Sequence, residues 1–422
     1  MFDRDYLMFI QTLSGTAYLL RKEYSINIMK HILLITTRSI YRRSGEQRLI
    51  QNRADALREL YGVDTSFIAF TDKKKFNDKS TLLRDFEVET IYFENFFDII
   101  SKYLFFIKRI KVKVKTKKYD CIILSGFFLT NIAKTIKKID KNAFIVADIH
   151  GTIKELIEFN PGFKRSLLYL MLSDYEKKML RYVDDIFVVT NELKQMYLNK
   201  TKKEISAHII PCALENKDYN YKQVMKYRKK WRAEFGVSDN EILFIYSGGN
   251  SPWQSIDEAY NIFSVFKKKY SESKFLIMSN SAIDVKYEDV IYRSFSADKV
   301  FEVLFAGDVG FLIRSNSLTN KVAFPNKYLE YVRANLEIIS TPYLSDISKE
   351  IKNENIGMIL DKEDSFNPEE LFFKINHREY KNELKRRRKI CDKYNFNKTL
   401  SNFVQEIKTQ IKEKQDETGN NM

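Results

Sequence analysis

The sequence has few residues that could form a metal site or a disulfide framework. Its 422 residues include three cysteines and four histidines. Cys121, Cys212 and Cys391 lie far apart, and no H-x-x-x-H or H-E-x-x-H pattern occurs. We therefore expect no bound metal and reduced cysteines, as in a cytoplasmic protein. Cys121 begins an apolar run and is interpreted as a core residue.

Long apolar runs are also absent. No stretch of 18 apolar residues occurs, which argues against a membrane-spanning helix. The N-terminus does not resemble a signal peptide, because acidic residues precede its short apolar part and charges interrupt it. Residues 1–28 are either an upstream extension or the product of a mis-assigned start, since Met29 directly precedes a strand-like run. We expect a cytoplasmic protein that can also lie at the inner face of the plasma membrane.

No nucleic-acid-binding signature is present, although the net charge is +15. Such a charge favours a nucleic acid or an anionic membrane as partner. The alternative is an AT-rich genome, which would raise Lys together with the abundant Ile, Asn, Phe and Tyr. Because neither an aromatic RNP box nor a zinc finger occurs, we expect no nucleic-acid partner.

Short apolar runs alternate with helix-like stretches along the whole chain. The strand-like runs of the first half are His31–Thr37, Thr65–Phe70, Thr90–Phe93, Cys121–Leu124, Phe144–Ala147, Ile186–Thr190 and Ile209–Pro211. After a charged, turn-rich stretch at 215–240, the runs are Ile242–Ser247, Phe275–Met278, Val290–Tyr292, Val309–Ile313, Leu336–Ser340 and Gly357–Leu360. This alternation predicts two parallel sheets with helices on both faces and a boundary near residues 211–220.

The stretch from Asp308 to Pro342 carries the most informative chemistry. It predicts a strand, a polar loop, a helix with Pro325 in its first turn, and another strand. The start of such a helix attracts anions, and Lys327 adds a full charge there. Glu330, one turn on, can accept two hydrogen bonds from a ribose diol. The segment can therefore hold a nucleotide, or it is an ordinary surface helix with a weak Lys–Glu pair.

The sequence PNKYLEYVRANLEIIST resembles the donor-site segment of retaining GT-B glycosyltransferases like those of family 4, often written P-T-K-x-x-E-Y-x-x-x-G-x-x-x-I. Pro325, Lys327, Glu330 and Tyr331 match, and Asn326 replaces the Thr. The resemblance implies an α/β GT-B fold, in which two Rossmann-like parallel-sheet domains face a cleft. It places an acceptor domain at 29–214, a nucleotide-sugar donor domain at 215–395, and a C-terminal helix and polar tail at 396–422.

Two positions depart from the family pattern. Asn335 stands where Gly is usual, and both residues can adopt similar backbone conformations. Such families often carry a second Glu eight residues before Glu330, and Val322 occupies that position. The usual carboxylate pair is therefore incomplete.

A D-I-H-G motif follows the run Phe144–Ala147. Asp148 and His150 leave the carboxyl end of this predicted strand. The motif resembles the mid-domain motif of the same glycosyltransferases, which implies that His150 and Asp148 approach the transferred sugar. A neutral His can hydrogen-bond a sugar hydroxyl. The alternative is a His that caps the following helix.

A glycine pair follows the first strand of the second half. Gly248 and Gly249 permit close approach of the backbone to a phosphate. Many relatives carry Arg and Lys in this loop, whereas this chain has Trp253 and Gln254, a pair that resembles a subset of polysaccharide-assembly transferases. Arg314 and the lysine of the donor helix are then the candidates to neutralise a diphosphate. The Trp253 side chain either stacks on a base or sugar or caps the core.

A basic loop follows the first strand of the chain. Arg38, Arg42 and Arg43 precede Gly45, which opens a helix. In the resembled families the corresponding loop faces the donor diphosphate or the acceptor. The alternative is a solvated basic loop.

The run Ser101–Lys118 combines apolar and basic side chains. Eight Lys or Arg accompany aromatic and aliphatic residues, which suits docking to an anionic inner leaflet. The alternative is a helix whose apolar face covers the sheet, and the alternation from Lys111 to Lys115 is also compatible with a strand.

Together these features predict an enzyme that moves a sugar from a nucleotide-sugar donor to a hydroxyl of a glycan or lipid-linked acceptor, in bacterial surface polysaccharide synthesis. The resemblance implies retention of anomeric configuration, and we expect no metal and no cofactor besides the donor. The alternatives are a non-catalytic GT-B partner of a glycan assembly complex and a GT-B nucleotide-sugar epimerase.

Overall fold

A computed structural model describes most of the chain. The described residues are 30–37, 45–73, 85–126, 129–201, 204–213, 219–249, 251–279, 290–296, 298–361, 365–405 and 407–409. The predicted extension at 1–28 and the basic-loop residues Arg38, Arg42 and Arg43 lie outside them.

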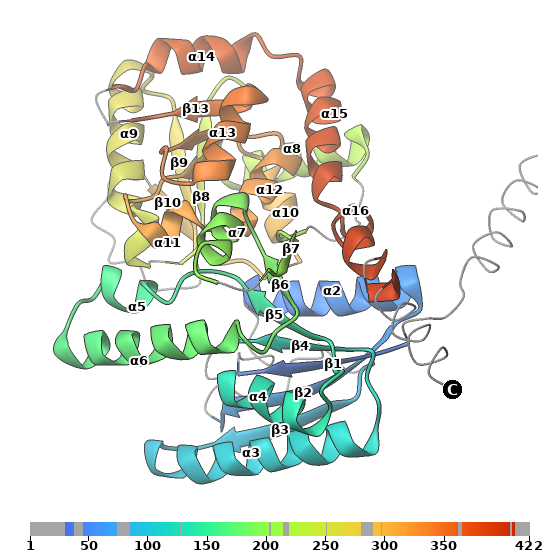
Figure 1. The fold of residues 1–422 in the computed structure, drawn as a ribbon. Coiled ribbons are helices and arrows are strands. Elements are labelled where there is room, and N and C mark those ends of the chain that lie inside the picture. Colours follow the sequence, from blue (N-terminus) through green and yellow to red (C-terminus); the bar gives the residue numbers. More distant parts are fainter. Residues whose placement is uncertain are drawn as a thin grey trace, which may run out of the picture. The chain divides into compact units, whose positions relative to one another are not determined.

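Two parallel sheets organise the chain (Figure 1). The first has seven strands in the order β3-β2-β1-β4-β5-β6-β7. Its strands are β1 (His31–Thr36), β2 (Asp64–Asp72), β3 (Val88–Phe93), β4 (Cys121–Ser125), β5 (Ile145–Ile149), β6 (Asp185–Val188) and β7 (Ser206–Ile209). The structure places β7 earlier in the chain than the predicted strand Ile209–Pro211, because the polar segment Ser206–His208 pairs with β6. The Cys121 side chain is buried in β4, as expected of a core residue.

The second sheet has six strands in the order β10-β9-β8-β11-β12-β13. They are β8 (Leu243–Ser247), β9 (Lys274–Met278), β10 (Val290–Arg293), β11 (Val309–Leu312), β12 (Glu337–Ser340) and β13 (Gly357–Ile359). All its pairings are parallel. In both sheets the central strands are buried on both faces, which explains why they read as continuous apolar runs.

Helices connect the strands in both halves. In the first half they are α2 (Gly45–Tyr61), α3 (Phe96–Thr116), α4 (Thr130–Ile139), α5 (Glu155–Glu158), α6 (Phe163–Met179) and α7 (Asn191–Leu198). Because α3 continues through Thr116, the strand interpretation of Lys111–Lys115 is wrong. Its buried side includes Phe106, whose ring lies 5.3 Å from that of Phe70 in β2.

The second half contains the remaining described elements. They are α8 (Tyr221–Glu234), η2 (Pro252–Gln254), α9 (Ile256–Lys269), α10 (Val300–Leu304), α11 (Leu318–Lys321), α12 (Asn326–Arg333), α13 (Ser345–Asn353), α14 (Pro368–Asn376), α15 (Tyr380–Cys391), η4 (Asp392–Tyr394) and α16 (Phe396–Thr399). No helix of the described chain is long and apolar enough to cross a bilayer.

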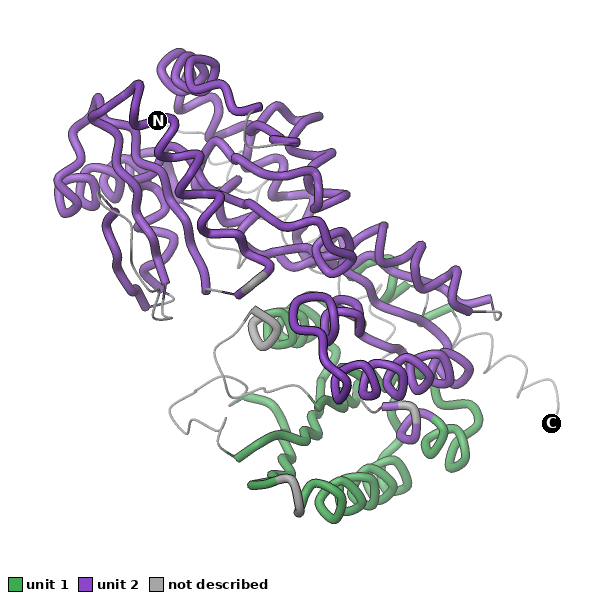
Figure 2. Tube along the Cα trace, turned by 90° about the vertical axis from the view of Figure 1, so that its left-hand side faces the viewer, with its two compact units in different colours: residues 1–125, 134–145, 400–422 green, residues 126–133, 146–399 purple. Residues whose placement is uncertain are grey.

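Internal contacts divide the chain into two compact units (Figure 2). Unit 1 comprises residues 1–125, 134–145 and 400–422, and unit 2 comprises 126–133 and 146–399. Unit 2 therefore holds the whole second sheet together with β6, β7 and α5 to α7. The boundary predicted from sequence near residues 211–220 stays a prediction.

The core of the second sheet is built from alternating residues of its strands. Phe244, Phe275 and Phe311 point to the side covered by α9, whose Phe263 ring lies 5.5 Å from that of Phe244. Each such aromatic side chain removes roughly 150–250 Å² from water. At ~25 cal/mol per Å² of apolar surface, each stabilises the fold by several kcal/mol before conformational entropy is counted.

Buried charges secure the amino-terminal end of the same sheet. Asp308 accepts hydrogen bonds from Arg228 at 2.6 Å, Arg232 at 3.0 Å and Arg378 at 3.2 Å, and from the backbone N–H of Leu243 at 2.9 Å. Burial acts to raise the pKa of Asp308, but the three guanidinium groups outweigh it and lower that pKa to about 2. These contacts hold α8, β8 and the start of β11 together at the amino-terminal end of the strands.

Candidate functional site

Gly248 follows β8 at the carboxyl end of the second sheet, where doubly wound sheets bind their ligands. Its φ is +144°, and a Cβ atom there would lie 2.0 Å from Lys327 Nζ. The lysine side chain therefore occupies the space that any other residue at 248 would fill. This close approach explains the glycine and brings the predicted phosphate loop and the predicted donor helix together.

Lys327, in the first turn of α12, is held by polar and aromatic neighbours. Its Nζ donates a hydrogen bond to Gln254 Oε1 and lies 4.5 Å from the centre of the Tyr246 ring. The Tyr246 hydroxyl lies 2.6 Å from both Gln254 Oε1 and the carbonyl oxygen of Gly249, and it donates to one at a time. Tyr246 and Gln254 thus fix the position of the ammonium group.

The charge of Lys327 is not fully compensated by these neighbours. Burial lowers the pKa of Lys327 well below its ordinary value, and the nearby Arg314 lowers it further, while Glu330 acts in the opposite direction. A lysine in this state gains from an added negative charge.

Arg314 supplies a second cation just beyond β11. It is 6% exposed, and burial lowers the pKa of its guanidinium. The backbone of Arg314 is fixed by Thr341, whose hydroxyl accepts from the Arg314 N–H at 3.1 Å and donates to its carbonyl at 2.7 Å. The guanidinium itself donates to the Ile313 carbonyl at 3.2 Å. Among the described residues, neither this group nor Lys327 forms an ion pair with a carboxylate.

Two cations that share a low-dielectric site without paired carboxylates destabilise the free protein. An anion with several oxygen acceptors would relieve that cost. A phosphate or diphosphate fits this requirement, because a guanidinium and an ammonium can bind different oxygens of the same group.

The rest of α12 sets the position of this site. Tyr328 to Val332 are all buried, so the interpretation of α12 as an ordinary surface helix is wrong. The Tyr331 hydroxyl accepts a hydrogen bond from the Ser247 N–H at 3.0 Å, and its ring packs over Gly310, where a Cβ would lie 2.7 Å from it. Asn335, just after the helix, has a φ of +64°, the left-handed conformation that Gly and Asn adopt most readily at the end of a helix.

Glu330 and Asn326 occupy the predicted places on α12. Asn326 is its first residue, and Pro325 is the N-cap. Glu330 is buried, and its negative charge acts to raise the pKa of Lys327. A buried carboxylate one turn from a cation site is consistent with the predicted ribose contact, which stays a prediction.

Asp148 and His150 form a buried pair at the carboxyl end of β5. His150 Nε2 lies 2.8 Å from Asp148 Oδ2, and both side chains are largely buried. The next helix, α5, has Lys154 as its N-cap, so His150 is not its cap. The carboxylate orients the imidazole ring, as expected of a positioned hydrogen-bonding group. Within the described ranges no hydrogen bond or ion pair joins this pair to Arg314 or Lys327, and its catalytic role stays a prediction.

The basic loop gives less information. Gly45 begins α2, as predicted, whereas Arg43 lies outside the described residues.

Sequence reasoning missed Glu158 and Phe159, at the end of α5. The Glu158 carboxylate accepts hydrogen bonds from the N–H groups of Leu318 at 2.7 Å and Thr319 at 2.9 Å, and from the Thr319 hydroxyl at 2.5 Å. Burial acts to raise the pKa of Glu158, but these hydrogen bonds lower it. The Phe159 ring lies 5.5 Å from that of Trp253, so Trp253 packs against the chain itself. No local pattern signals contacts that span so many residues.

Groups of three or more His, Cys, Asp or Glu with metal-binding geometry do not occur within the described ranges. The predicted independence of metal stays a prediction.

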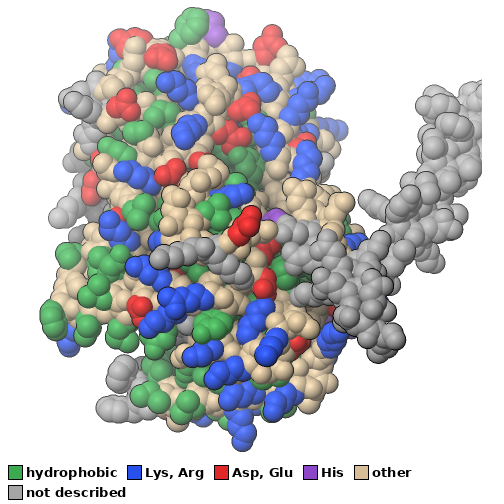
Figure 3. Space-filling model, in the orientation of Figure 1, with side chains coloured by type: hydrophobic (Ala, Val, Ile, Leu, Met, Phe, Trp, Pro, Cys, Tyr) green, Lys and Arg blue, Asp and Glu red, His purple; other side chains and the backbone are tan. Residues whose placement is uncertain are grey.

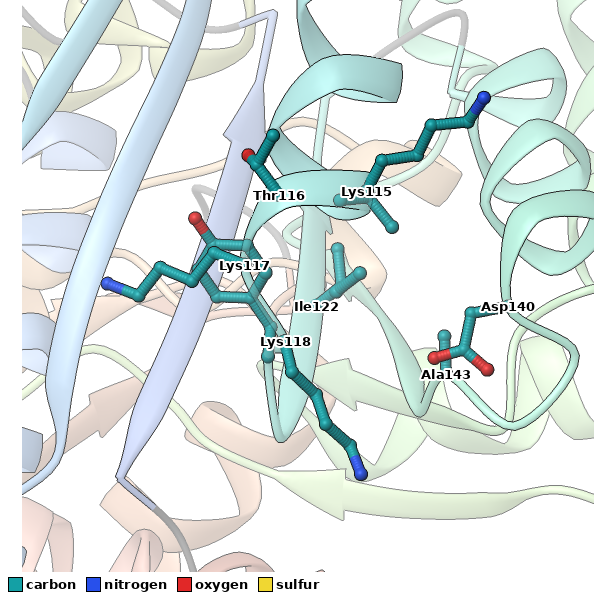
Figure 4. Close-up of a pocket in the computed structure, with 9 residues that line it drawn as sticks. Lys115, Thr116, Lys117, Lys118, Ile122, Asp140 and Ala143 are labelled. Atoms are coloured by element: carbon teal, nitrogen blue, oxygen red, sulfur yellow. The ribbon is translucent and has the colours of Figure 1, made fainter.

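A pocket of about 150 Å³ lies elsewhere, in unit 1, between the end of α3 and the start of β4 (Figure 4). It is lined by Lys115, Lys117, Lys118, Asp140 and other residues. The three lysine side chains extend in different directions rather than converging on one point. Because it lies at the amino-terminal end of β4, opposite the end where such sheets bind ligands, we do not assign it to the candidate site.

No protein-family model matches the chain, and no curated protein matches it in sequence. Solved structures, however, share its architecture. A glycosyltransferase from Rickettsia africae superposes with a TM-score of 0.65 at 14% identity, covering 91% of this chain and 99% of its own.

Two further structures are similar over comparable lengths. WaaG, a glycosyltransferase involved in lipopolysaccharide biosynthesis, gives a TM-score of 0.63 at 13% identity and covers 90% of this chain and 99% of its own. A trehalose-6-phosphate structure from E. coli with bound UDP-2-fluoro glucose gives 0.60 at 11% identity, with 90% and 99% coverage. These likenesses establish the architecture predicted from the sequence: the chain has the α/β GT-B fold of two Rossmann-like parallel sheets.

Proposed function

We propose that the protein is a glycosyltransferase that takes a sugar from a nucleotide-sugar donor and transfers it to a hydroxyl group of a glycan or lipid-linked acceptor. The observation that carries the proposal is the pair of cations at the carboxyl end of the second sheet, the buried Arg314 and the partly buried Lys327. Both lack a carboxylate ion-pair partner among the described residues, so the site suits an added anion.

The nature of that anion follows from the surrounding residues. Gly248 leaves room for the Lys327 side chain beside the end of β8, and Glu330 is placed one turn along α12. The two cations suit a diphosphate, and the neighbouring carboxylate of Glu330 suits the ribose attached to it. The similar E. coli structure with bound UDP-2-fluoro glucose supports a nucleotide-sugar as the donor.

The chemistry that we assign to the site is stabilisation of the leaving group. As the bond between the sugar and the diphosphate breaks, negative charge grows on the diphosphate oxygens, and the fixed cations of Lys327 and Arg314 lower the energy of that state. They do so without a metal ion, which is why we propose metal-independent transfer. The Asp148–His150 pair would orient a sugar hydroxyl, and the family resemblance favours retention of configuration.

The acceptor and the biological role rest on weaker support. WaaG acts in lipopolysaccharide biosynthesis, and the Trp253–Gln254 pair resembles polysaccharide-assembly transferases. We therefore propose a role in bacterial surface polysaccharide synthesis, at the inner face of the plasma membrane, within the cytoplasm.

The first test measures binding of UDP, GDP and other nucleoside diphosphates by calorimetry, with Lys327→Met as the variant and Lys321→Met as the matched control. Lys321 is exposed at the end of α11 and is bonded to none of the site residues. We expect the wild type and the control to bind one of the nucleotides and Lys327→Met to bind it much more weakly. If the wild type binds none of them, the proposal fails.

A second candidate is a non-catalytic GT-B partner of a glycan assembly complex. Val322 favours it, since this fully buried residue stands where relatives often have a carboxylate. An assay of donor hydrolysis without acceptor separates the transferase from the non-catalytic partner, because we expect slow hydrolysis only from an active transferase. Nucleotide binding without hydrolysis or transfer of any donor would favour the partner role.

A further inference from the structure

Helix α6 exposes an apolar face that no described part of the chain covers. Phe163 is 87% exposed, Leu167 53%, Leu170 63% and Met171 47%. Their spacing of i, i+4, i+7 and i+8 places them on one side of the helix. In Figure 3, hydrophobic side chains gather on the surface at the left, over the end of the molecule where Figure 1 places α5 and α6.

This face is distinct from the one that α6 buries within the protein. The buried residues of α6 are Leu172 and Met179, seven residues apart and on the opposite side of the helix from Leu167 and Leu170. The helix thus carries two apolar faces, of which packing within the chain uses one. Isolated exposed hydrophobic residues are ordinary, but four on one stripe of a single helix indicate a binding surface.

The charges around the stripe indicate its partner. Lys164 and Arg165 are exposed at the amino-terminal end of α6, and Lys177 and Lys178 at the other end. Of the acidic residues, Asp174 pairs with Lys178 at 2.5 Å, and Glu176 bonds Lys200 at 2.9 Å. An apolar stripe with basic residues at both ends is complementary to a surface of anionic headgroups above acyl chains.

We propose that α6 docks on an anionic lipid surface. Its four exposed apolar side chains lie in the interface, and the flanking Lys and Arg contact the headgroups. The basic run of α3 that the sequence suggested for this role also exposes apolar side chains, including Ile100, Leu104 and Phe105. We favour α6 because it directly follows the segment that contacts the candidate site. Two of the basic residues of α3 are already paired, Lys113 with Glu87 and Arg109 with Glu89. Its Phe106 and Ile110 are buried in unit 1.

The docking surface is continuous with the segment that contacts the candidate site. Only three residues separate Phe159 from the start of α6, and Phe159 packs on Trp253 while Glu158 binds α11. If the proposed function holds, lipid docking brings a lipid-linked acceptor to the donor site. Docking itself does not require the transfer reaction, so the two proposals can fail separately.

The test is co-sedimentation of the full chain with vesicles of phosphatidylglycerol and phosphatidylcholine, or of phosphatidylcholine alone, at low and high salt. The variant is Leu167→Ser with Leu170→Ser. The matched control is Val265→Ser with Phe373→Ser, two exposed apolar residues on α9 and α14. All four side chains are exposed, so the fold should be retained, which circular dichroism checks.

We expect salt-sensitive binding to the anionic vesicles only, reduced about tenfold or more in the α6 variant and unchanged in the control. Equal binding of wild type and α6 variant, or no binding by the wild type, would overturn the proposal. So would loss of binding in Leu104→Ser with Phe105→Ser but not in the α6 variant, since that result would assign docking to α3. A concentration-dependent dimer abolished by the α6 variant, without vesicle binding, would identify a second copy as the occupant instead.

Discussion

Replacing Lys327 by Met should change two properties of the protein in opposite directions. The change keeps the length of the side chain and removes its charge. If Lys327 is there to bind an anion, the free protein gains stability while affinity for a nucleoside diphosphate falls. A structural lysine would give the reverse, because its loss would cost stability and leave binding intact.

The size of each effect follows from the contacts. Removing the charge relieves its burial and its repulsion from Arg314, and loses the hydrogen bond to Gln254 and the contact with the Tyr246 ring. Replacing a whole buried ion pair by apolar groups of similar size is often neutral or stabilises by about 1–4 kcal/mol. For this single charge, which also loses the contacts named above, we expect ~1 kcal/mol. Loss of a charged hydrogen bond to phosphate costs about 1.5–3 kcal/mol, or roughly 10- to 150-fold in Kd.

The difference in stability between the wild type and Lys327→Met should also change with pH in a defined direction. Because the pKa of Lys327 is lower in the folded than in the unfolded protein, the wild type recovers stability as pH rises between those two values. The advantage of Lys327→Met is therefore largest below the folded pKa and shrinks toward pH ~10.

Urea unfolding followed by tryptophan fluorescence measures the stability change, since both tryptophans, Trp231 and Trp253, lie in unit 2. Calorimetry measures the nucleotide affinity, with Lys321→Met as the control in both assays. A Lys327→Met protein that is less stable than the wild type and binds the nucleotide equally well would refute the assignment of Lys327 to an anion site.

Three other changes test separate parts of the structure. Glu330→Ala should weaken nucleotide binding by about 1.5–3 kcal/mol with little effect on the turnover of bound donor, and unchanged calorimetric affinity would remove it from the ribose site. His150→Ala should lower kcat for transfer while leaving nucleotide affinity unaltered, whereas an equal loss of both would indicate a structural role. Asp308→Asn should cost about 3–5 kcal/mol in urea unfolding because three arginines lose their partner, against under ~0.5 kcal/mol for the exposed Asp174→Asn. Since the pKa of Asp308 falls from 3.8 to about 2 on folding, about 2 kcal/mol of wild-type stability should be present above pH ~4 and lost on acidification toward pH ~2. A wild type whose stability does not fall in that range would contradict this.

The sequence predicted elements well wherever the local pattern decides structure. Short apolar runs became strands because a parallel sheet buries both faces, and the order of strands and helices matched along both halves. The helix that carries Lys327 was also located to within a residue, with Pro325 as its N-cap rather than in its first turn, since a helix start is defined within a few positions. Gly248 could be located for the same reason.

Contacts between distant segments could not be read in this way. Tyr246 lies on β8 as one aromatic residue among many, and only the folded structure puts its ring beneath Lys327 and its hydroxyl beside Gln254. The run Lys111–Lys115 alternates like a strand, yet it forms the last turns of α3, because Phe106 and Ile110 earlier in the helix are buried against the sheet. The exposed stripe of α6 was missed because apolar residues surround that helix, so the sequence does not distinguish the packed face from the open one.

Val322 stands where the resembled glycosyltransferases often carry a second Glu, and the structure around it differs from what a carboxylate there would need. The Val322 side chain is fully buried, and its carbonyl accepts a hydrogen bond from the Thr190 hydroxyl at 2.8 Å. The short helix before it, α11, is capped at its start by Glu158 and by the Ser317 hydroxyl, which accepts from the Asn320 N–H at 3.1 Å. A carboxylate at 322 would be fully buried, which is costly unless it finds a hydrogen-bond partner. The connection between β11 and α12 is therefore built around an apolar residue, and the site must obtain its electrostatics from the two cations and from Glu330.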